Sequence, residues 1–140
     1  MLRYANVYGP RQTPKGEGGV VAIFLDRLNQ GLPLVVYGDG EQTRDFVYVG
    51  DVVRANLAAV RRGGGHTVQV ATAAATTVNE LVQWLGEIHG TPIRTEYRPE
   101  RPGDIRHSCL DNRMAKDVLG WSPQYDMYKG LKETYDFAMK

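Results

Sequence analysis

The chain has 140 residues, of which 42% are hydrophobic and 24% charged, and this is the composition of one ordinary globular domain. A formal net charge of +1 argues against a general nucleic-acid or membrane-surface binder, because those proteins carry strongly basic faces. The single cysteine, Cys109, cannot form an internal disulfide, and no apolar run is long enough to span a membrane, so we expect a cytoplasmic protein.

The first predicted element is a strand over Leu2–Tyr8, which Gly9 and Pro10 end. The sequence enters this strand almost at once, and we therefore expect that it starts inside a larger domain. Asn6 is either a ligand contact at the carboxyl edge of a sheet or a turn residue before Gly-Pro. Residues 12–19 are predicted to form a glycine-rich loop that lacks the spacing of a dinucleotide-binding turn.

A helix follows this loop, and its apolar side chains repeat at helical spacing: Val21, Phe24, Leu25 and Leu28. Two predicted strands come next, Leu34–Tyr37 and Thr43–Val49. They flank the turn Gly38–Gly40, which indicates a hairpin or a bent strand.

The second of these strands carries a cation at its start. Alternation places Arg44, Phe46 and Tyr48 on one face and Val47 on the other. Arg44 is either a ligand-binding cation at the mouth of the turn or an exposed charge paired with Asp45 or Glu41.

Asp51 is expected to begin the next helix, whose apolar stripe is formed by Val53, Leu57 and Val60. A glycine run breaks that helix, and residues 66–71 then alternate like a strand. The clearest local signal in the chain is the capping box of Thr77 and Glu80. It begins a helix with a regular apolar stripe: Val78, Leu81, Val82, Leu85 and Ile88.

A short strand, Ile93–Tyr97, leads into a proline-stiffened loop over residues 98–107 that carries three arginines, Arg98, Arg101 and Arg106. This loop is either an anion-binding segment or a solvated charged loop. Two helices end the chain. The first follows Asp111 as its cap and turns Met114, Ala115, Val118 and Leu119 inward. The second, over 128–139, is expected to bury Tyr128, Leu131, Tyr135 and Ala138.

Several familiar chemical motifs are absent from the sequence. No histidines or cysteines have metal-ligand spacing, and there is no Walker lysine loop, Gly-x-Ser-x-Gly elbow or Gly-x-Gly-x-x-Gly turn after a strand. The order of elements predicts an α/β chain with a small mixed sheet and packed helices.

Four segments together resemble one family: residues 2–12, residues 38–52, Arg101-Pro-Gly-Asp104 and Leu119-Gly-Trp-Ser-Pro123. In this order they are similar to the C-terminal portion of the extended short-chain dehydrogenase/reductases, closest to the nucleotide-sugar epimerases and dehydratases around UDP-glucose 4-epimerase. The resemblance implies that residues 1–140 are a substrate-binding domain with the last Rossmann strands attached. It also implies that an N-terminal Rossmann domain, with the NAD turn and the catalytic Tyr-x-x-x-Lys, precedes Met1.

The resemblance assigns roles to nine side chains. In the substrate site, Asn6 holds the sugar or its pyrophosphate, Val20 contacts the nucleotide, Val35 and Tyr37 line the base, Arg44 and Arg101 clamp the pyrophosphate, and Asp104 accepts hydrogen bonds from ribose hydroxyls. Tyr4 lies beside the nicotinamide of NAD. Ser108 borders the sugar, where a small side chain leaves room for an N-acetylated hexose. Forked cations suit a pyrophosphate, and a carboxylate suits a ribose diol.

The implied activity of the parent is 4-epimerisation of a UDP-hexose in galactose metabolism: NAD oxidises C4, the 4-keto sugar rotates, and the hydride returns to the other face. This chain alone is expected to be inactive and to bind UDP-sugars weakly. A same-superfamily 4,6-dehydratase or decarboxylase, and a stand-alone binding module, are the alternatives.

Two further expectations concern the surface and one loop. An apolar face and an edge strand left without the Rossmann domain predict self-association as a homo-oligomer. Ala73 and Ala74 stand where relatives commonly have glycines, and alanine adopts positive φ only at a cost, which leaves open whether this loop keeps the family's turn.

Overall fold

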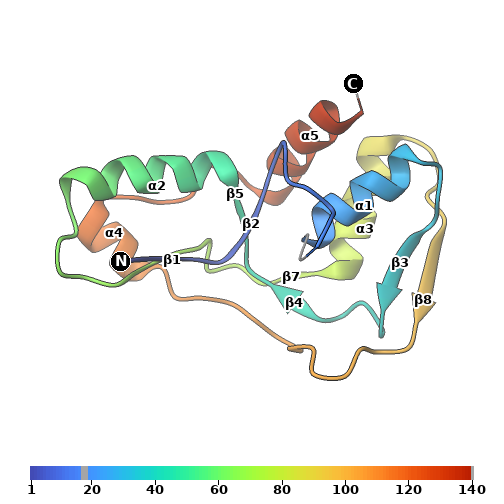
Figure 1. Cartoon of the computed structure of the whole chain (residues 1–140), viewed down its shortest axis with the longest axis horizontal. Coiled ribbons are helices and arrows are strands. Elements are labelled where there is room, and N and C mark those ends of the chain that lie inside the picture. Colours follow the sequence, from blue (N-terminus) through green and yellow to red (C-terminus); the bar gives the residue numbers. More distant parts are fainter. Residues whose placement is uncertain (17–18, 140) are drawn as a thin grey trace.

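The computed structural model describes residues 1–16 and 19–139, so part of the predicted loop 12–19 lies outside the described residues. The fold is a mixed α/β arrangement in which three of four two-stranded ladders are parallel (Figure 1). The strands are β1 (Leu2–Tyr4), β2 (Asn6–Tyr8), β3 (Leu34–Tyr37), β4 (Thr43–Arg44), β5 (Phe46–Tyr48), β6 (Val68–Val70), β7 (Thr76–Thr77) and β8 (Thr95–Arg98). The helices are α1 (Val20–Asn29), α2 (Val49–Arg61), α3 (Val78–His89), α4 (Arg113–Leu119) and α5 (Met127–Ala138).

Two hydrophobic cores lie on either side of β5. Figure 1 shows α2, α4 and β1 at one end of the molecule and α1, α3, β3 and β8 at the other. Phe46 and Tyr48 pack into the core beneath α1, α3 and α5, whereas Val47 packs into the core beneath α2 and α4. The predicted alternation along this strand is therefore confirmed, and both of its faces are buried.

The predicted strand over Leu2–Tyr8 is divided at Ala5. β1 pairs with β6 and β2 pairs with β5, both in parallel. The backbone N–H of Ala5 donates to Val70 and that of Asn6 donates to Asp45, so the chain changes partners between these two residues. Apolar alternation cannot reveal such a change, because both halves have strand geometry.

The Gly38–Gly40 turn redirects the chain and does not form a hairpin. β3 pairs in parallel with β8, while β4 pairs antiparallel with β7. The predicted strand Thr43–Val49 is interrupted at Asp45, whose side chain is 1% exposed.

The predicted inner stripe of α2 is wrong. Val53, Leu57 and Val60 are 50%, 65% and 83% exposed, and the helix instead buries Asp51, Val52 and Ala55. The Asp51 carboxylate accepts the backbone N–H groups of Gln124 and Tyr125 at 3.1 Å each, which turns this side of the helix inward. The helix begins at Val49 and not at Asp51, which is buried two residues inside it.

Smaller corrections concern the last two helices. Ala115 and Leu119 are buried as predicted, but Met114 is 47% exposed. The cap of α4 is Asn112 and not Asp111. In α5, Leu131 is buried whereas Tyr128 is 45% exposed; Gly130 and Thr134 fill the inner face instead.

The capping box of α3 is confirmed. The Thr77 hydroxyl accepts the Glu80 N–H at 3.0 Å, and the Glu80 carboxylate accepts the Thr77 N–H at 3.4 Å. This box joins β7 to α3 and so fixes the position at which α3 begins. None of the helices in the described residues is long and apolar enough to cross a membrane.

The loop after β6 is organised by the carboxylate of Asp45. It accepts the Thr72 N–H and hydroxyl at 2.9 and 2.7 Å, the Ala73 N–H at 2.9 Å and the Leu110 N–H at 3.3 Å. Ala73 has φ 61°, so alanine does adopt the left-handed conformation here. We attribute this to the charge-assisted hydrogen bonds, which offset the cost of about 1–2 kcal/mol.

Candidate nucleotide-sugar site

A pocket with a volume of about 320 Å³ opens between α1, β3, β4 and the loop that follows β8. The structure brings together at this pocket all of the residues that the resemblance assigns to the substrate except Ser108. They are Asn6, Val20, Val35, Tyr37, Arg44, Arg101 and Asp104. These side chains come from five separate segments of the chain, so their meeting is a result of the fold and not of sequence proximity.

Arg44 lies at the junction of β4 and β5, on the face that Phe46 continues. Its Nη1 donates to the Thr43 carbonyl at 2.6 Å, and among the described residues no carboxylate pairs with it. Asp45 is turned toward the loop after β6, and Glu41 accepts a hydrogen bond from Asn79. The sequence alternative of an ion pair with either acid is therefore not what the structure shows.

Arg101 and Tyr37 form the opposite wall. The Arg101 guanidinium carbon lies 3.7 Å from the centroid of the Tyr37 ring, in a stacked cation–π contact. The pKa of the Tyr37 hydroxyl is lowered, first because Arg101 hydrogen-bonds its anionic form and attracts it, and then because Arg98 is close. Tyr37 thus presents an aromatic surface beside two cations.

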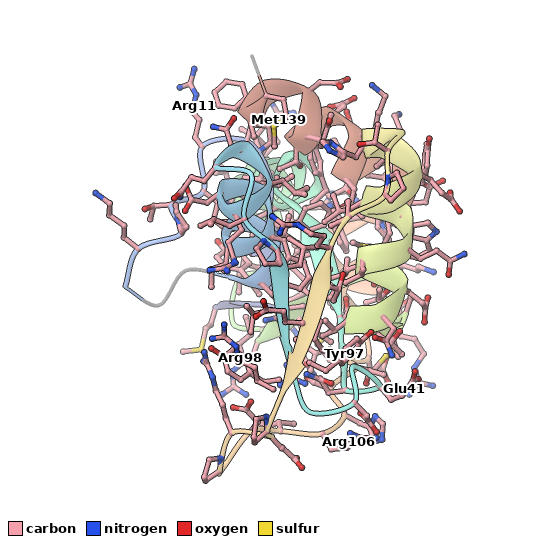
Figure 2. The ribbon with its side chains drawn as sticks, turned by 90° about the vertical axis from the view of Figure 1, so that its right-hand side faces the viewer. Arg11, Glu41, Tyr97, Arg98, Arg106 and Met139 are labelled. Carbon is pink, nitrogen blue, oxygen red and sulfur yellow. The ribbon has the colours of Figure 1, made fainter. Side chains whose placement is uncertain are left out.

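Two further cations line the pocket, Arg27 and Arg98. The sequence pointed to Arg98 only as part of the arginine-rich loop over residues 98–107, and it did not point to Arg27. The Arg27 Nε donates to the Pro33 carbonyl at 2.5 Å, and Arg98 pairs with Glu96 at 3.0 Å. The helical spacing of 20, 23, 24 and 27 could have placed Arg27, because all four of these residues line the pocket. Figure 2 shows Arg98 on the side of β8 that faces α1, whereas Tyr97 points toward α3.

A second hollow of about 260 Å³ adjoins the pocket at Asn6. Asn6, Val20 and Phe46 line both spaces. An elongated ligand can therefore lie with one part among the arginines and another beyond Asn6.

Ser108 and Tyr4 lie apart from this pocket. The Ser108 N–H donates to the Thr43 carbonyl at 3.1 Å, which ties it to β4 just outside the lining. The Tyr4 hydroxyl donates to Asn56 Oδ1 at 2.6 Å on the side of α2. Tyr4 is the one side chain that the resemblance assigns to NAD, and the described residues offer no glycine turn at a helix N-terminus beside it. The described residues around Tyr4 therefore do not fit a dinucleotide site.

A Tyr-x-x-x-Lys spacing missed in the sequence does occur within the chain, at Tyr125 and Lys129. The Lys129 ammonium lies 4.3 Å from the centroid of the Tyr125 ring, which itself stacks on Tyr48 at 4.2 Å. Neither residue lines the candidate pocket. We interpret this pair as a packing contact at the start of α5.

The chemistry of the pocket favours an anion attached to a planar ring. Four arginines and one aspartate line it, together with the apolar side chains of Val20, Val35 and Val36 and the ring of Tyr37. Guanidinium groups bind phosphate oxygens through two parallel donors, and an aromatic ring stacks on a base. Among the described residues, no group of three or more acids, histidines or cysteines could hold a metal ion.

Comparison with known proteins identifies the family of this chain. The family model described as "NAD dependent epimerase/dehydratase family" matches residues 1–71. A UDP-glucose 4-epimerase from Mycolicibacterium smegmatis is 46% identical over 95% of this chain and 43% of its own length. The crystal structure of UDP-glucose 4-epimerase with UDP-glucose from Thermotoga maritima is 51% identical, has a TM-score of 0.93, and is matched over 97% of this chain and 44% of its own.

A third similar structure is the UDP-N-acetylglucosamine 4-epimerase from Methanobrevibacter ruminantium in complex with UDP-N-acetylmuramic acid. It is 35% identical with a TM-score of 0.91, over 97% of this chain and 44% of its own. The chain thus spans less than half the length of the relatives it matches. With the family model covering half of the sequence and these folds superimposing closely, the chain belongs to the NAD-dependent epimerase/dehydratase family.

Proposed function

We propose that this chain is the nucleotide-sugar-binding part of an NAD-dependent UDP-sugar 4-epimerase. In this proposal residues 1–140 form the C-terminal substrate domain with the last Rossmann strands, and an N-terminal Rossmann domain supplies NAD and the acid–base groups. Turnover then requires both parts, and this chain binds UDP-sugars without converting them.

The observation that carries the proposal is the pairing of Arg44 and Arg101 in one pocket beside Tyr37. Neither arginine has a carboxylate partner among the described residues, so their charges are available to a ligand. A pyrophosphate carries two negative charges at neutral pH and accepts from both guanidinium groups. The base then stacks against Val35 and Tyr37, and the ribose hydroxyls donate to Asp104.

The sugar is proposed to extend toward Asn6 and the adjoining hollow. Asn6 has both donors and an acceptor, so its amide can bind a sugar hydroxyl or a phosphate oxygen. Its place at the carboxyl-terminal side of β1, at the start of β2, puts this amide at the junction of the two spaces.

The test is calorimetric titration of the chain with UDP-glucose, comparing wild type with Arg44→Gln. Losing one charge-assisted contact of about 1.5–3 kcal/mol weakens binding by about 10- to 100-fold. Arg61→Gln is the matched control, because Arg61 is an exposed arginine on α2 outside the pocket. Equal affinities of wild type and Arg44→Gln contradict the proposal.

We propose further that the site accepts UDP-N-acetylglucosamine as well as UDP-glucose, because Ser108 is small. Ser108 lies beside Thr43 and outside the pocket lining. Its proposed role at the border of the sugar comes from the resemblance. Ser108→Tyr is expected to weaken binding of the N-acetylated sugar more than that of UDP-glucose. Equal losses for both ligands, or no loss, contradict this proposal.

The exposed stripe of α2 supports a proposal about partners. Val53, Leu57 and Val60 form an unpaired apolar face, and among the described residues β1 pairs on one edge only, with β6. We infer that the NAD-binding domain packs here in the parent and that the chain alone self-associates. Sedimentation that shows only a monomer at high concentration contradicts the second statement.

A further inference from the structure

A segment that we call the strap, residues 99–105, crosses the rim of the candidate pocket. Every residue in it is exposed, and it carries Arg101 and Asp104 into the pocket lining. Among the described residues, the only backbone hydrogen bond within the strap is a long one, from the Asp104 N–H to the Arg101 carbonyl at 3.4 Å. With so few internal backbone bonds, the strap is positioned by its two ends and by the contact of Arg101 with the Tyr37 ring.

The two ends of the strap are tied to different strands. At the first end, the Gly38 N–H donates to the Arg98 carbonyl at 2.8 Å and extends the β3–β8 ladder. At the second end, the Thr43 N–H donates to the Arg106 carbonyl at 2.9 Å. The strap therefore bridges the strand that carries Tyr37 and the strand that carries Arg44.

The second end also carries an ion pair with fork geometry. Arg106 Nη1 and Nη2 lie 2.8 Å from Oδ1 and Oδ2 of Asp39. The same carboxylate accepts the Glu41 N–H at 2.9 Å, which fixes it within its own turn. The pKa of Asp39 is lowered to about 2, mainly by the Arg106 hydrogen bonds. Figure 2 shows Arg106 and Glu41 in the lower part of the view, on the same side of β8.

We propose that Asp39 and Arg106 are a positioning pair for the nucleotide site. Neither residue lines the main pocket, so neither is assigned a ligand contact. By locking the second end of the strap to the Gly38–Gly40 turn, the pair holds Arg101 and Asp104 opposite Arg44. This inference rests on the proposed function for its ligand and on the geometry of the strap for its mechanism.

The first test uses no ligand. Backbone ¹⁵N relaxation of Gly103 and Asp104 is compared between wild type and Arg106→Gln, with Arg113→Gln as the control. Arg113 also forms a forked exposed pair, with Asp111, but lies outside the strap. Increased mobility of the strap in Arg106→Gln alone supports the pair; unchanged relaxation overturns it, whatever the chain binds.

The second test uses UDP as the probe, in calorimetric titration. Because an exposed ion pair contributes only modestly, Arg106→Gln is expected to weaken UDP binding by about fivefold. Because the two residues act as one unit, the double variant Asp39→Asn/Arg106→Gln should lose no more UDP affinity than Arg106→Gln alone. Additive losses, or wild-type affinity in Arg106→Gln, overturn the proposal. No binding of UDP by wild type refutes the proposed function instead, and the relaxation test still decides the pair.

Discussion

The loop after β6 depends on hydrogen bonds to the carboxylate of Asp45. Asp45→Asn tests this dependence, because asparagine has almost the same shape as aspartate. In the wild type, Oδ1 accepts from the Thr72 N–H and hydroxyl, and Oδ2 accepts from the Ala73 and Leu110 N–H groups. Asparagine keeps Oδ1, but an NH₂ group replaces Oδ2 and faces the N–H groups of Ala73 and Leu110. Both hydrogen bonds to Oδ2 are therefore lost, and these two donors no longer have an acceptor.

The magnitude follows from these two bonds. A hydrogen bond to a charged group contributes about 1.5–3 kcal/mol, and the longer bond to Leu110, at 3.3 Å, belongs at the low end. Because both hydrogen bonds are only part-buried, we take the low end for each and expect a loss of about 3 kcal/mol in the free energy of unfolding. This is a large part of the 5–15 kcal/mol that holds an ordinary domain together, and the variant should still fold.

The assay is urea unfolding followed by the fluorescence of Trp84 and Trp121, with the m-value as a check on two-state behaviour. Asp111→Asn is the control, because Asp111 is an exposed aspartate that pairs with Arg113. We expect the control to lose no more than about 1 kcal/mol. A loss below about 1 kcal/mol in Asp45→Asn, equal to that of the control, refutes the assigned role of Asp45.

Three other changes test separate features of the fold. Ala73→Gly removes a side chain at φ 61° and should raise the free energy of unfolding, measured by urea unfolding, by about 0.5–1 kcal/mol. A lower free energy of unfolding contradicts the backbone strain assigned to Ala73. Gly40→Ala should cost about 2–4 kcal/mol, because its Cβ would lie 2.0 Å from Asn79 Oδ1, whereas Gly65→Ala has φ +80° in open space and measures the backbone cost alone. Equal costs for these two glycines rule out the Asn79 clash. Burial raises the pKa of Tyr48 to about 12, so the folded state keeps a proton that the unfolded chain releases above about pH 10. Stability should therefore fall as pH rises from about 10 to 12, and Tyr48→Phe should make that slope shallower; an unchanged slope contradicts the shift.

The elements that the sequence predicts best are those with a local cause. The capping box at Thr77 requires only residues within one turn of α3, and the predicted stripe of α1 is buried at Val21, Phe24 and Leu25. By contrast, α2 has two candidate stripes at helical spacing. The inner one is chosen by Asp51, whose partners, Gln124 and Tyr125, lie more than 70 residues away. The spacing of apolar residues within α2 cannot reveal partners so distant in the sequence.

The candidate site shows the same contrast between features with a local cause and features set by distant residues. Family resemblance led to Arg44 and Arg101, and the fold places both at one pocket. Arg27 shares a helix face with Val20, which the resemblance had assigned to the nucleotide, so its helical spacing from Val20 was the signal that could have found it. The left-handed Ala73 was beyond local propensity, since a carboxylate distant in sequence, that of Asp45, supplies the compensating hydrogen bonds.

The central claim is that Arg44 and Arg101 hold the pyrophosphate of a nucleotide sugar in the pocket beside Tyr37. A crystal structure of this chain with UDP-glucose measures this directly. The account predicts pyrophosphate oxygens within about 3 Å of both guanidinium groups, with the base against Val35 and Tyr37. A nucleotide bound elsewhere, for example in the hollow of about 240 Å³ between α1 and α5, would contradict it.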